Sequence, residues 1–203
     1  VFSGTPVTMS ASFNGGFAEG WTYTWTLDGA EVGTGTSLTV TPENNGSAMT
    51  TAVYRLTAVN VCEGTEAFRE TYDYTVNTWP APQMTWLGDI ETVLVSGKTV
   101  DMTPNCLGGD PNAWSYTWTL DGSTVGNDTH YTFAGVNGQE NGSLQASVTL
   151  QAVNAPANID QGREIVLSHT FTVWPEPKQS GQSPEEITVY SGRTATLSAS
   201  FTG

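Results

Sequence analysis

An internal repeat of about 95 residues constrains the fold more than any other feature of this chain. Residues 21–29 (WTYTWTLDG) recur 93 positions later as residues 114–122 (WSYTWTLDG). Residues 52–60 (AVYRLTAVN) recur 94 positions later as residues 146–154 (ASVTLQAVN). Because several motifs return in one order at nearly one spacing, the chain is predicted to consist of successive copies of one structural unit.

The ends of the repeat define the predicted domains. The motif Trp-Pro-x-Pro closes two copies, at residues 79–82 and 174–177, and a hydrophobic-x-Ser-Gly motif opens three, at residues 1–4, 94–97 and 189–192. We therefore predict a first domain over residues 1–80, whose first strand is incomplete, and a second over residues 81–177. Residues 178–203 are expected to be the two opening strands of a truncated third domain.

Alternation of apolar and polar residues with a period of two predicts β-strands along the whole chain. In the first repeat, strands are expected at residues 6–13, 21–27, 31–33, 37–41, 50–61 and 68–79. In the second repeat, the first strand is expected to run unbroken over residues 83–95, and the last over 164–174. Short strands with frequent turns, in a unit of this length, are typical of an immunoglobulin-like β-sandwich. The predicted fold is all-β, with tandem immunoglobulin-like domains arranged head to tail.

Two motifs that both repeats share carry structural predictions. Trp25 and Trp118 lie in phase with the other apolar residues of their strands, so they are expected in a buried core and not on a sugar-binding surface. Asp28–Gly29 and Asp121–Gly122 each favour a two-residue type I′ hairpin turn, which needs positive φ at both central residues. These residues are expected to form the fold and not to perform chemistry.

The exits of the repeats, Trp79–Pro80 and Trp174–Pro175, predict short and stiff joints. Proline fixes φ and favours extended backbone over a flexible coil. The array is therefore expected to behave as a rigid spacer. The tryptophan that precedes each proline either wedges against the next domain or caps the core of its own domain, and the sequence favours neither.

The two cysteines, Cys62 and Cys106, are not expected to pair with each other. Cys62 follows a long strand of the first repeat, and Cys106 follows an early strand of the second. Tracing the strands places the two about one strand length apart, roughly 30 Å, whereas a disulfide needs Cα atoms within about 4.4–6.8 Å. Each is predicted to be a free thiol or to pair outside these residues.

Charge and motif content exclude several classes of function. Twenty Asp and Glu residues against six Lys and Arg give a formal net charge of −14. A nucleic-acid binder needs a basic face, and an anionic membrane surface would repel this chain. No apolar run is long enough to span a membrane. No catalytic or metal-binding motif occurs, and His130 and His169 occupy non-equivalent positions, so neither an enzyme nor a cofactor or metal is expected.

The shared pattern Tyr-x-Trp-x-x-Asp-Gly, followed by an alternating strand and a Leu-Thr-Ala-Val-Asn strand with Cys two residues on, resembles a known family. It is similar to the PKD-like and immunoglobulin-like repeats of large secreted surface adhesins of Bacteroidota, including those of gliding species. The resemblance covers both full repeats, although Val148 replaces Tyr54 in the second. It implies export across the outer membrane, often by the type 9 system, and display as long extracellular filaments without catalytic residues.

The sequence therefore predicts a stalk or filament segment of a bacterial cell-surface adhesin. Its expected partners are neighbouring immunoglobulin-like domains of the same chain and, in a filament, laterally associated copies. One alternative is a glycan-binding or protein-binding module, whose candidate contacts are Trp21, Trp114 and Trp86. Another is an accessory module of a secreted hydrolase or of a phage surface protein.

Overall fold

The computed structural model describes residues 1–157, 159, 161–182 and 187–202. Among these, the secondary structure is β apart from one short 3₁₀ turn, which confirms the predicted all-β class. The chain divides into two compact units. The first comprises Val1–Gln83, Cys106–Trp114 and Val153–Arg163, and the second comprises Met84–Asn105, Ser115–Ala152 and Glu164–Gly203.

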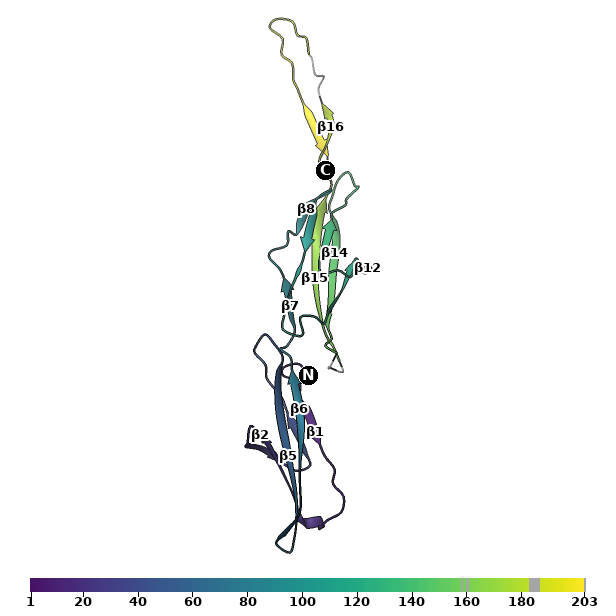
Figure 1. The fold of residues 1–203 in the computed structure, drawn as a ribbon. Helices are drawn as coiled ribbons and strands as arrows, with labels where there is room; N and C mark the ends of the chain where they lie inside the picture. Colours follow the sequence, from purple (N-terminus) through teal and green to yellow (C-terminus); the bar gives the residue numbers. More distant parts are fainter. Residues whose placement is uncertain (158, 160, 183–186, 203) are drawn as a thin grey trace. The chain divides into compact units, whose positions relative to one another are not determined.

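The first β-sandwich is built from two sheets (Figure 1). One sheet has four strands in the order β3-β2-β5-β6, and the other pairs β1 with β4. Its elements are β1 (Val7–Ser10), η1 (Ala18–Gly20), β2 (Trp21–Leu27), β3 (Ala30–Thr34), β4 (Ser37–Val40), β5 (Thr50–Cys62) and β6 (Thr65–Thr78). A parallel bridge between Phe2 and Trp79 joins the opening of the repeat to the end of its last strand.

Antiparallel pairing sets the register of this sandwich. Strand β2 pairs with β5 from Trp21↔Asn60 to Leu27↔Tyr54. Residues that alternate along these strands therefore point to one face, and this face is apolar. The core lies between the sheets, and its buried members are Met9, Trp25, Tyr54, Leu56 and Val76.

The second β-sandwich has the same plan. A five-stranded sheet in the order β12-β11-β14-β15-β8 faces the pairs β13-β9 and β10-β7. Its strands are β7 (Gln83–Trp86), β8 (Val93–Val95), β9 (Thr99–Met102), β10 (Pro104–Leu107), β11 (Trp114–Leu120), β12 (Ser123–Gly126), β13 (Tyr131–Ala134), β14 (Leu144–Asn154) and β15 (Arg163–Trp174). Its fully buried side chains include those of Met102, Trp118, Val148, Leu150 and Phe171.

The structure corrects one predicted strand. Residues 83–95 do not form a single strand but two, β7 and β8, which join different sheets. Strand β7 pairs with β10, whereas β8 runs parallel to β15, with Val95 opposite Trp174. The chain turns between them at Gly88, whose φ of 79° suits glycine. Splitting the segment lets it cover one edge of each sheet.

A short antiparallel ribbon, β16 (Lys178–Gln182) with β17 (Ala199–Thr202), follows the second sandwich. These strands lie 95 positions after β7 and β10, so the ribbon repeats the opening pair of the second sandwich. Residues 183–186 and 203 of the predicted third domain lie outside the described residues. The three domain boundaries remain predictions.

Candidate functional site

The core tryptophans Trp25 and Trp118 are both fully buried, at 0% exposure. Each indole N–H still has a partner, because Trp25 Nε1 donates to the Gly35 carbonyl at 2.9 Å and Trp118 Nε1 donates to the Asp128 carbonyl at 2.8 Å. Gly35 and Asp128 are 93 positions apart, as the two tryptophans are. The same side chain therefore fixes the same loop in both sandwiches.

The Asp-Gly turns lie where the sequence places them, between β2 and β3 and between β11 and β12. Asp28 and Asp121 have φ values of 50° and 48°, and Gly29 and Gly122 both have a φ of 82°. Positive φ at both central residues is the requirement of a type I′ turn. In the second sandwich, the Asp121 carboxylate also accepts a hydrogen bond from the Ser147 amide at 2.8 Å.

Two buried asparagines, which sequence reasoning did not single out, clamp a loop in each sandwich. Asn60 of β5 accepts a bond from the Phe17 amide at 3.0 Å and donates to the Phe17 carbonyl at 2.8 Å. Asn154 of β14 makes the same two contacts with Asp110, at 3.0 and 2.7 Å. Asn60 is 1% exposed and Asn154 0%, so each amide group satisfies two backbone groups without water.

A second pair, Asn44 and Asn137, clamps the loop that precedes the longest strands. The side-chain amide of Asn44 donates to the carbonyls of Ala48 and Thr78, at 2.8 and 2.7 Å. That of Asn137 donates to Gly142 and Val173, at 2.9 and 2.8 Å. Both asparagines are buried, and they lie 93 positions apart. Each ties its loop to the last strand of its own sandwich.

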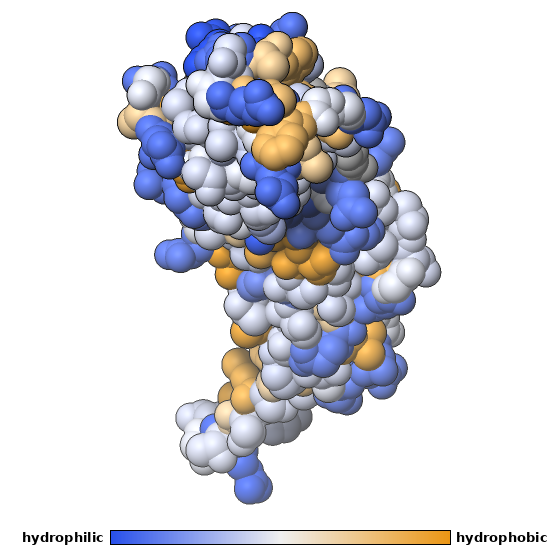
Figure 2. Space-filling model, turned by 90° about the horizontal axis from the view of Figure 1, so that it is seen from below, coloured by the Kyte–Doolittle hydropathy of each residue, from blue (hydrophilic) through white to orange (hydrophobic). Residues whose placement is uncertain are grey.

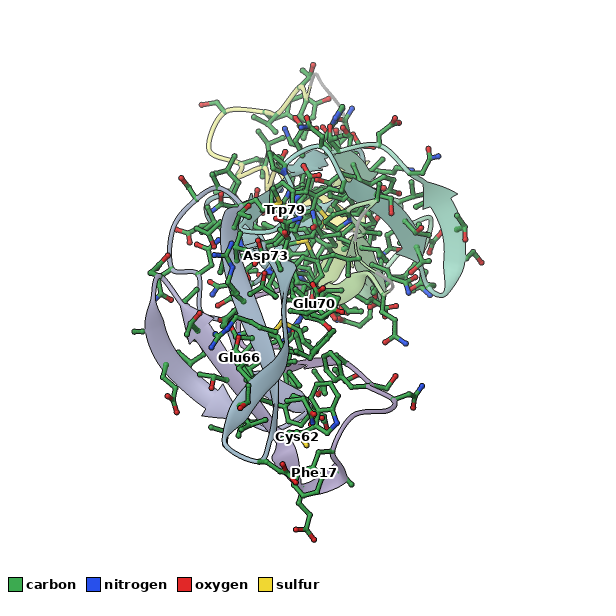
Figure 3. The ribbon with its side chains drawn as sticks, turned by 60° about the horizontal axis from the view of Figure 1, so that its bottom comes forward. Phe17, Cys62, Glu66, Glu70, Asp73 and Trp79 are labelled. Carbon is green, nitrogen blue, oxygen red and sulfur yellow. The ribbon has the colours of Figure 1, made fainter. Side chains whose placement is uncertain are left out.

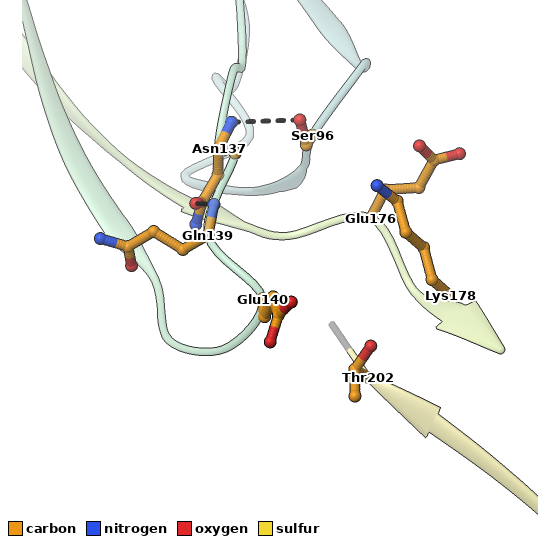
Figure 4. A pocket seen from close by; sticks show the side chains of 8 residues that line it. Ser96, Asn137, Gln139, Glu140, Glu176, Lys178 and Thr202 are labelled. Carbon is orange, nitrogen blue, oxygen red and sulfur yellow. Dashed lines mark hydrogen bonds between the residues drawn. The ribbon is translucent and has the colours of Figure 1, made fainter. Parts of the chain in front are cut away.

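Hollows next to these loops occupy equivalent places in the two units. The hollow in the first unit, of about 390 Å³, is lined by ten residues: Ser3, Glu43, Asn44, Asn45, Gly46, Pro80, Ala81, Gln83, Leu107 and Gly108. The hollow in the second, of about 210 Å³, is lined by eight: Ser96, Asn137, Gly138, Gln139, Glu140, Glu176, Lys178 and Thr202 (Figure 4). Their shared members are backbone loops and the buried asparagines, whereas the charged side chains differ.

The exit motifs contact their own sandwich. The Trp79 carbonyl accepts a bond from the Ser3 amide at 2.8 Å, and the Trp174 carbonyl accepts one from the Ser96 amide at 2.8 Å. Pro80 and Pro175 are buried, while Trp79 is half-buried and the Trp174 side chain is 44% exposed. In the first unit, the Pro80 carbonyl also accepts a bond from the Gly109 amide at 2.9 Å.

The three tryptophans proposed as ligand contacts, Trp21, Trp114 and Trp86, are half-buried. The Trp21 indole N–H donates to the Gly15 carbonyl at 3.1 Å, and one ring face stacks on Tyr23 with an interplanar angle of 4°. Trp86 stacks on the core residue Trp118, with ring centroids 5.9 Å apart. None of the three is a flat, open platform of the kind that a sugar ring stacks on.

An exposed acidic row follows β6, where Figure 3 shows Glu66, Glu70 and Asp73 between the Cys62 end and Trp79. Arg55 pairs with Asp73 at 2.7 Å, and its hydrogen bond holds the pKa of the Asp73 carboxyl below the ordinary value. Arg69 pairs with Glu66 at 2.7 Å and lowers the pKa of that carboxyl in the same way. These solvated pairs shape the surface charge and do not form a reactive site.

The cysteines and histidines are not gathered into one site. Cys62 ends β5 and is exposed, Cys106 lies half-buried in β10, and neither is in a disulfide within the described residues. His130 is exposed, whereas His169 packs edge-on against Phe171 with ring centroids 4.7 Å apart. In the part of the chain that the structure describes, no group of three His, Cys, Asp or Glu side chains is placed to hold a metal ion.

No described helix is long and apolar enough to cross a membrane. No protein-family model matches the sequence, and no curated protein is detectably similar to it.

Solved structures share the fold at low sequence identity. Fibronectin(III)-like modules of CbhA from Clostridium thermocellum are 13% identical, with 86% of this chain and 87% of that chain covered and a TM-score of 0.35. Immunoglobulin domains 1–5 of Sidekick-1 are 15% identical (99% and 42% covered, TM-score 0.48). Three N-terminal domains of the outer capsid protein Hoc of bacteriophage RB49 are 16% identical (98% and 64% covered, TM-score 0.44).

At these TM-scores the similarities carry no argument about function, and the fold assignment rests on the strand order of this chain itself. Two sandwiches with equivalent strands, turns and buried side chains define the class: the chain is an immunoglobulin-like β-sandwich repeat protein.

Proposed function

We propose that this chain is a non-catalytic, rigid spacer segment in the stalk or filament of a bacterial cell-surface adhesin, outside the cell. The observation that supports this proposal is the reuse of one buried framework in both sandwiches. The core tryptophan, the type I′ turn and the two clamping asparagines recur with their hydrogen bonds. The groups that could bind or react differ between the repeats. A segment whose repeated content is architecture is best suited to set distance.

Two further features agree with a spacer. The acidic composition gives like charges that oppose clumping of neighbouring stalks. The exits Trp79–Pro80 and Trp174–Pro175 each place a buried proline directly after the last strand, which leaves little free chain at that point. The partners we propose are the neighbouring repeats of a longer chain, whose domains would span residues 1–80, 81–177 and 178–203, and laterally associated copies.

A repeat deletion in the native protein tests the proposal. Removal of residues 81–177 should leave adhesion intact and reduce the height of the surface layer by roughly 40 Å, because β15 has 12 residues that each rise about 3.3 Å. Electron tomography of the cell surface measures the height. As a matched control, an unrelated immunoglobulin-like domain inserted in place of residues 81–177 should restore it.

The same deletion distinguishes the alternatives. Loss of adhesion with normal surface display would favour a glycan-binding or protein-binding module, and loss of a secreted hydrolytic activity would favour an accessory module. The binding alternative has one supporting feature, the exposed rings of Phe68 (38%) and Tyr72 (43%) beside Trp21. The bonded indole and stacked face of Trp21 argue against a sugar platform there.

A further inference from the structure

The second sandwich shows how one edge of this fold is covered. Strand β7 pairs with β10, and the Leu87 amide continues that edge with a bond to the Thr103 carbonyl at 2.9 Å. The side chain of Met84 is 7% exposed, and Trp86 stacks on the core residue Trp118. Strand β7 therefore supplies backbone partners to β10 and apolar side chains to the core.

The equivalent edge of the first sandwich is open. Residues 11–14 lie 93 positions before β10 but form no strand. The Ala11 amide donates to the Thr36 carbonyl at 2.9 Å. The following amides, of Ser12, Phe13 and Asn14, have no hydrogen-bond partner among the described residues. An unpaired run of backbone at a sheet edge is a template for another strand.

Aromatic side chains cluster at this open edge. Phe13 takes the place of Cys106, and its ring centroid lies 5.3 Å from those of Trp21 and Tyr23 and 5.7 Å from that of Tyr72. Phe68 contacts Trp21 edge-on at 5.5 Å. Counted back from the exit tryptophan, the second repeat has Arg163 and Leu167 in place of Phe68 and Tyr72. Figure 2 views the molecule from below and shows orange apolar groups among polar ones.

We propose that residues 11–14 and the aromatic cluster of Phe13, Trp21, Tyr23, Phe68 and Tyr72 form an acceptor for an added β-strand. The occupant is an extended segment with apolar residues at alternating positions, as in Gln83–Trp86. It is supplied in cis by polypeptide that leads into Val1, as residues 82–93 lead into Leu94. Backbone bonds to the edge provide affinity, and the alternating side chains cover the rings.

A fusion tests the acceptor in the full chain. A second copy of residues 82–93 is joined directly before Val1, which reproduces the spacing of the second sandwich. Amide hydrogen exchange should show protection at residues 12–14 rising at least about tenfold, because strand pairing suppresses local opening. The melting temperature of the first sandwich should rise by about 5 °C. Exchange in the second sandwich, whose edge already holds β7, should not change.

The matched control carries the same extension with Met84→Asp and Trp86→Asp in the added copy only. It keeps the length and the backbone but cannot bury apolar side chains, so residues 12–14 should exchange as in the unextended chain. Equal protection from both extensions, or no protection from either, would overturn the proposal. Protection of the unextended chain that grows with protein concentration would place the occupant in another molecule and would also overturn the assignment in cis.

Discussion

On the longest pair of strands, equivalent positions of the two sandwiches hold different chemistry. Arg55 and Asp73 form an ion pair in the first, whereas Thr149 and Ser168 share a hydroxyl contact at 3.0 Å in the second. Beneath these surfaces, the buried groups make the same bonds to the same loops. The comparison shows which interactions the fold depends on. A solvated cross-strand pair contributes at most about 1 kcal/mol and can be exchanged, whereas a buried polar group needs its partner.

The largest predicted effect comes from the core tryptophans. Trp118→Ala should destabilise the second sandwich by about 3–5 kcal/mol through loss of buried area and an unfilled cavity. Trp25→Ala should cost less, by about 0.5–1.5 kcal/mol, because only Trp118 also stacks on Trp86. Urea unfolding followed by amide exchange measures each sandwich separately. Equal losses would contradict the role given to Trp86.

The asparagine clamps should have equal effects in the two sandwiches. Asn60→Ala and Asn154→Ala each leave a buried N–H and a buried carbonyl without their partner, so each should cost about 2–3 kcal/mol. Amide exchange at Phe17 and Asp110 should accelerate in the corresponding variant. The exposed Asn45→Ala serves as the control, with an expected change within about 0.5 kcal/mol. A clamp that matters in one sandwich only would break the equivalence.

Substitutions at Tyr74 and His169 should have opposite signs. These residues lie at equivalent distances before the exit tryptophans. Tyr74 Oη donates to the Ser10 carbonyl at 2.9 Å, so Tyr74→Phe should cost about 1 kcal/mol. His169 Nε2 is buried without a hydrogen-bond partner in the described structure, so His169→Phe should stabilise the second sandwich by about 1 kcal/mol. Thermal unfolding of both variants checks the two signs, and a loss of stability in His169→Phe would mean that the nitrogen has a partner.

The smallest effect is a difference in acid sensitivity. Arg55 lowers the pKa of Asp73, so this pair stabilises the first sandwich above the unfolded pKa of the carboxyl, and the contribution is lost as pH falls through the folded pKa. The pair Thr149–Ser168 does not titrate and should give the second sandwich no such dependence. NMR titration should show the pKa of Asp73 rising toward its ordinary value in Arg55→Gln. An unchanged pKa would show that Arg55 is not the cause.

Sequence reasoning recovered strands where alternation and turn signals agree. The strand expected at residues 21–27 is β2, bounded by the Asp28–Gly29 turn. It failed at residues 83–95, because alternation shows which side chains are buried but not which sheet a strand pairs with. The change of partner at Gly88 is decided by the two sheet edges that the segment covers, which lie far from it in the sequence.

The clamps were missed for a related reason. Asn60 bonds to a residue 43 positions earlier, and Asn154 to one 44 positions earlier, contacts that no local pattern encodes. A signal was nevertheless available. Asn60 continues the buried phase of Leu56 and Ala58, and a polar residue in that phase must find partners inside the protein. The aromatic cluster around Phe13 gave no such signal, because its rings come from separate strands.

The parallel contact between the opening of each repeat and its last strand has a mechanical consequence. The bonds from Ser3 to Trp79 and from Ser96 to Trp174 join two segments that run in the same direction and lead toward opposite ends of the repeat. When the ends are pulled apart, these segments slide along each other, so neighbouring bonds are loaded together and not unzipped one after another. Each sandwich is thus fastened most firmly against tension along the chain, the direction in which drag on an anchored filament would act.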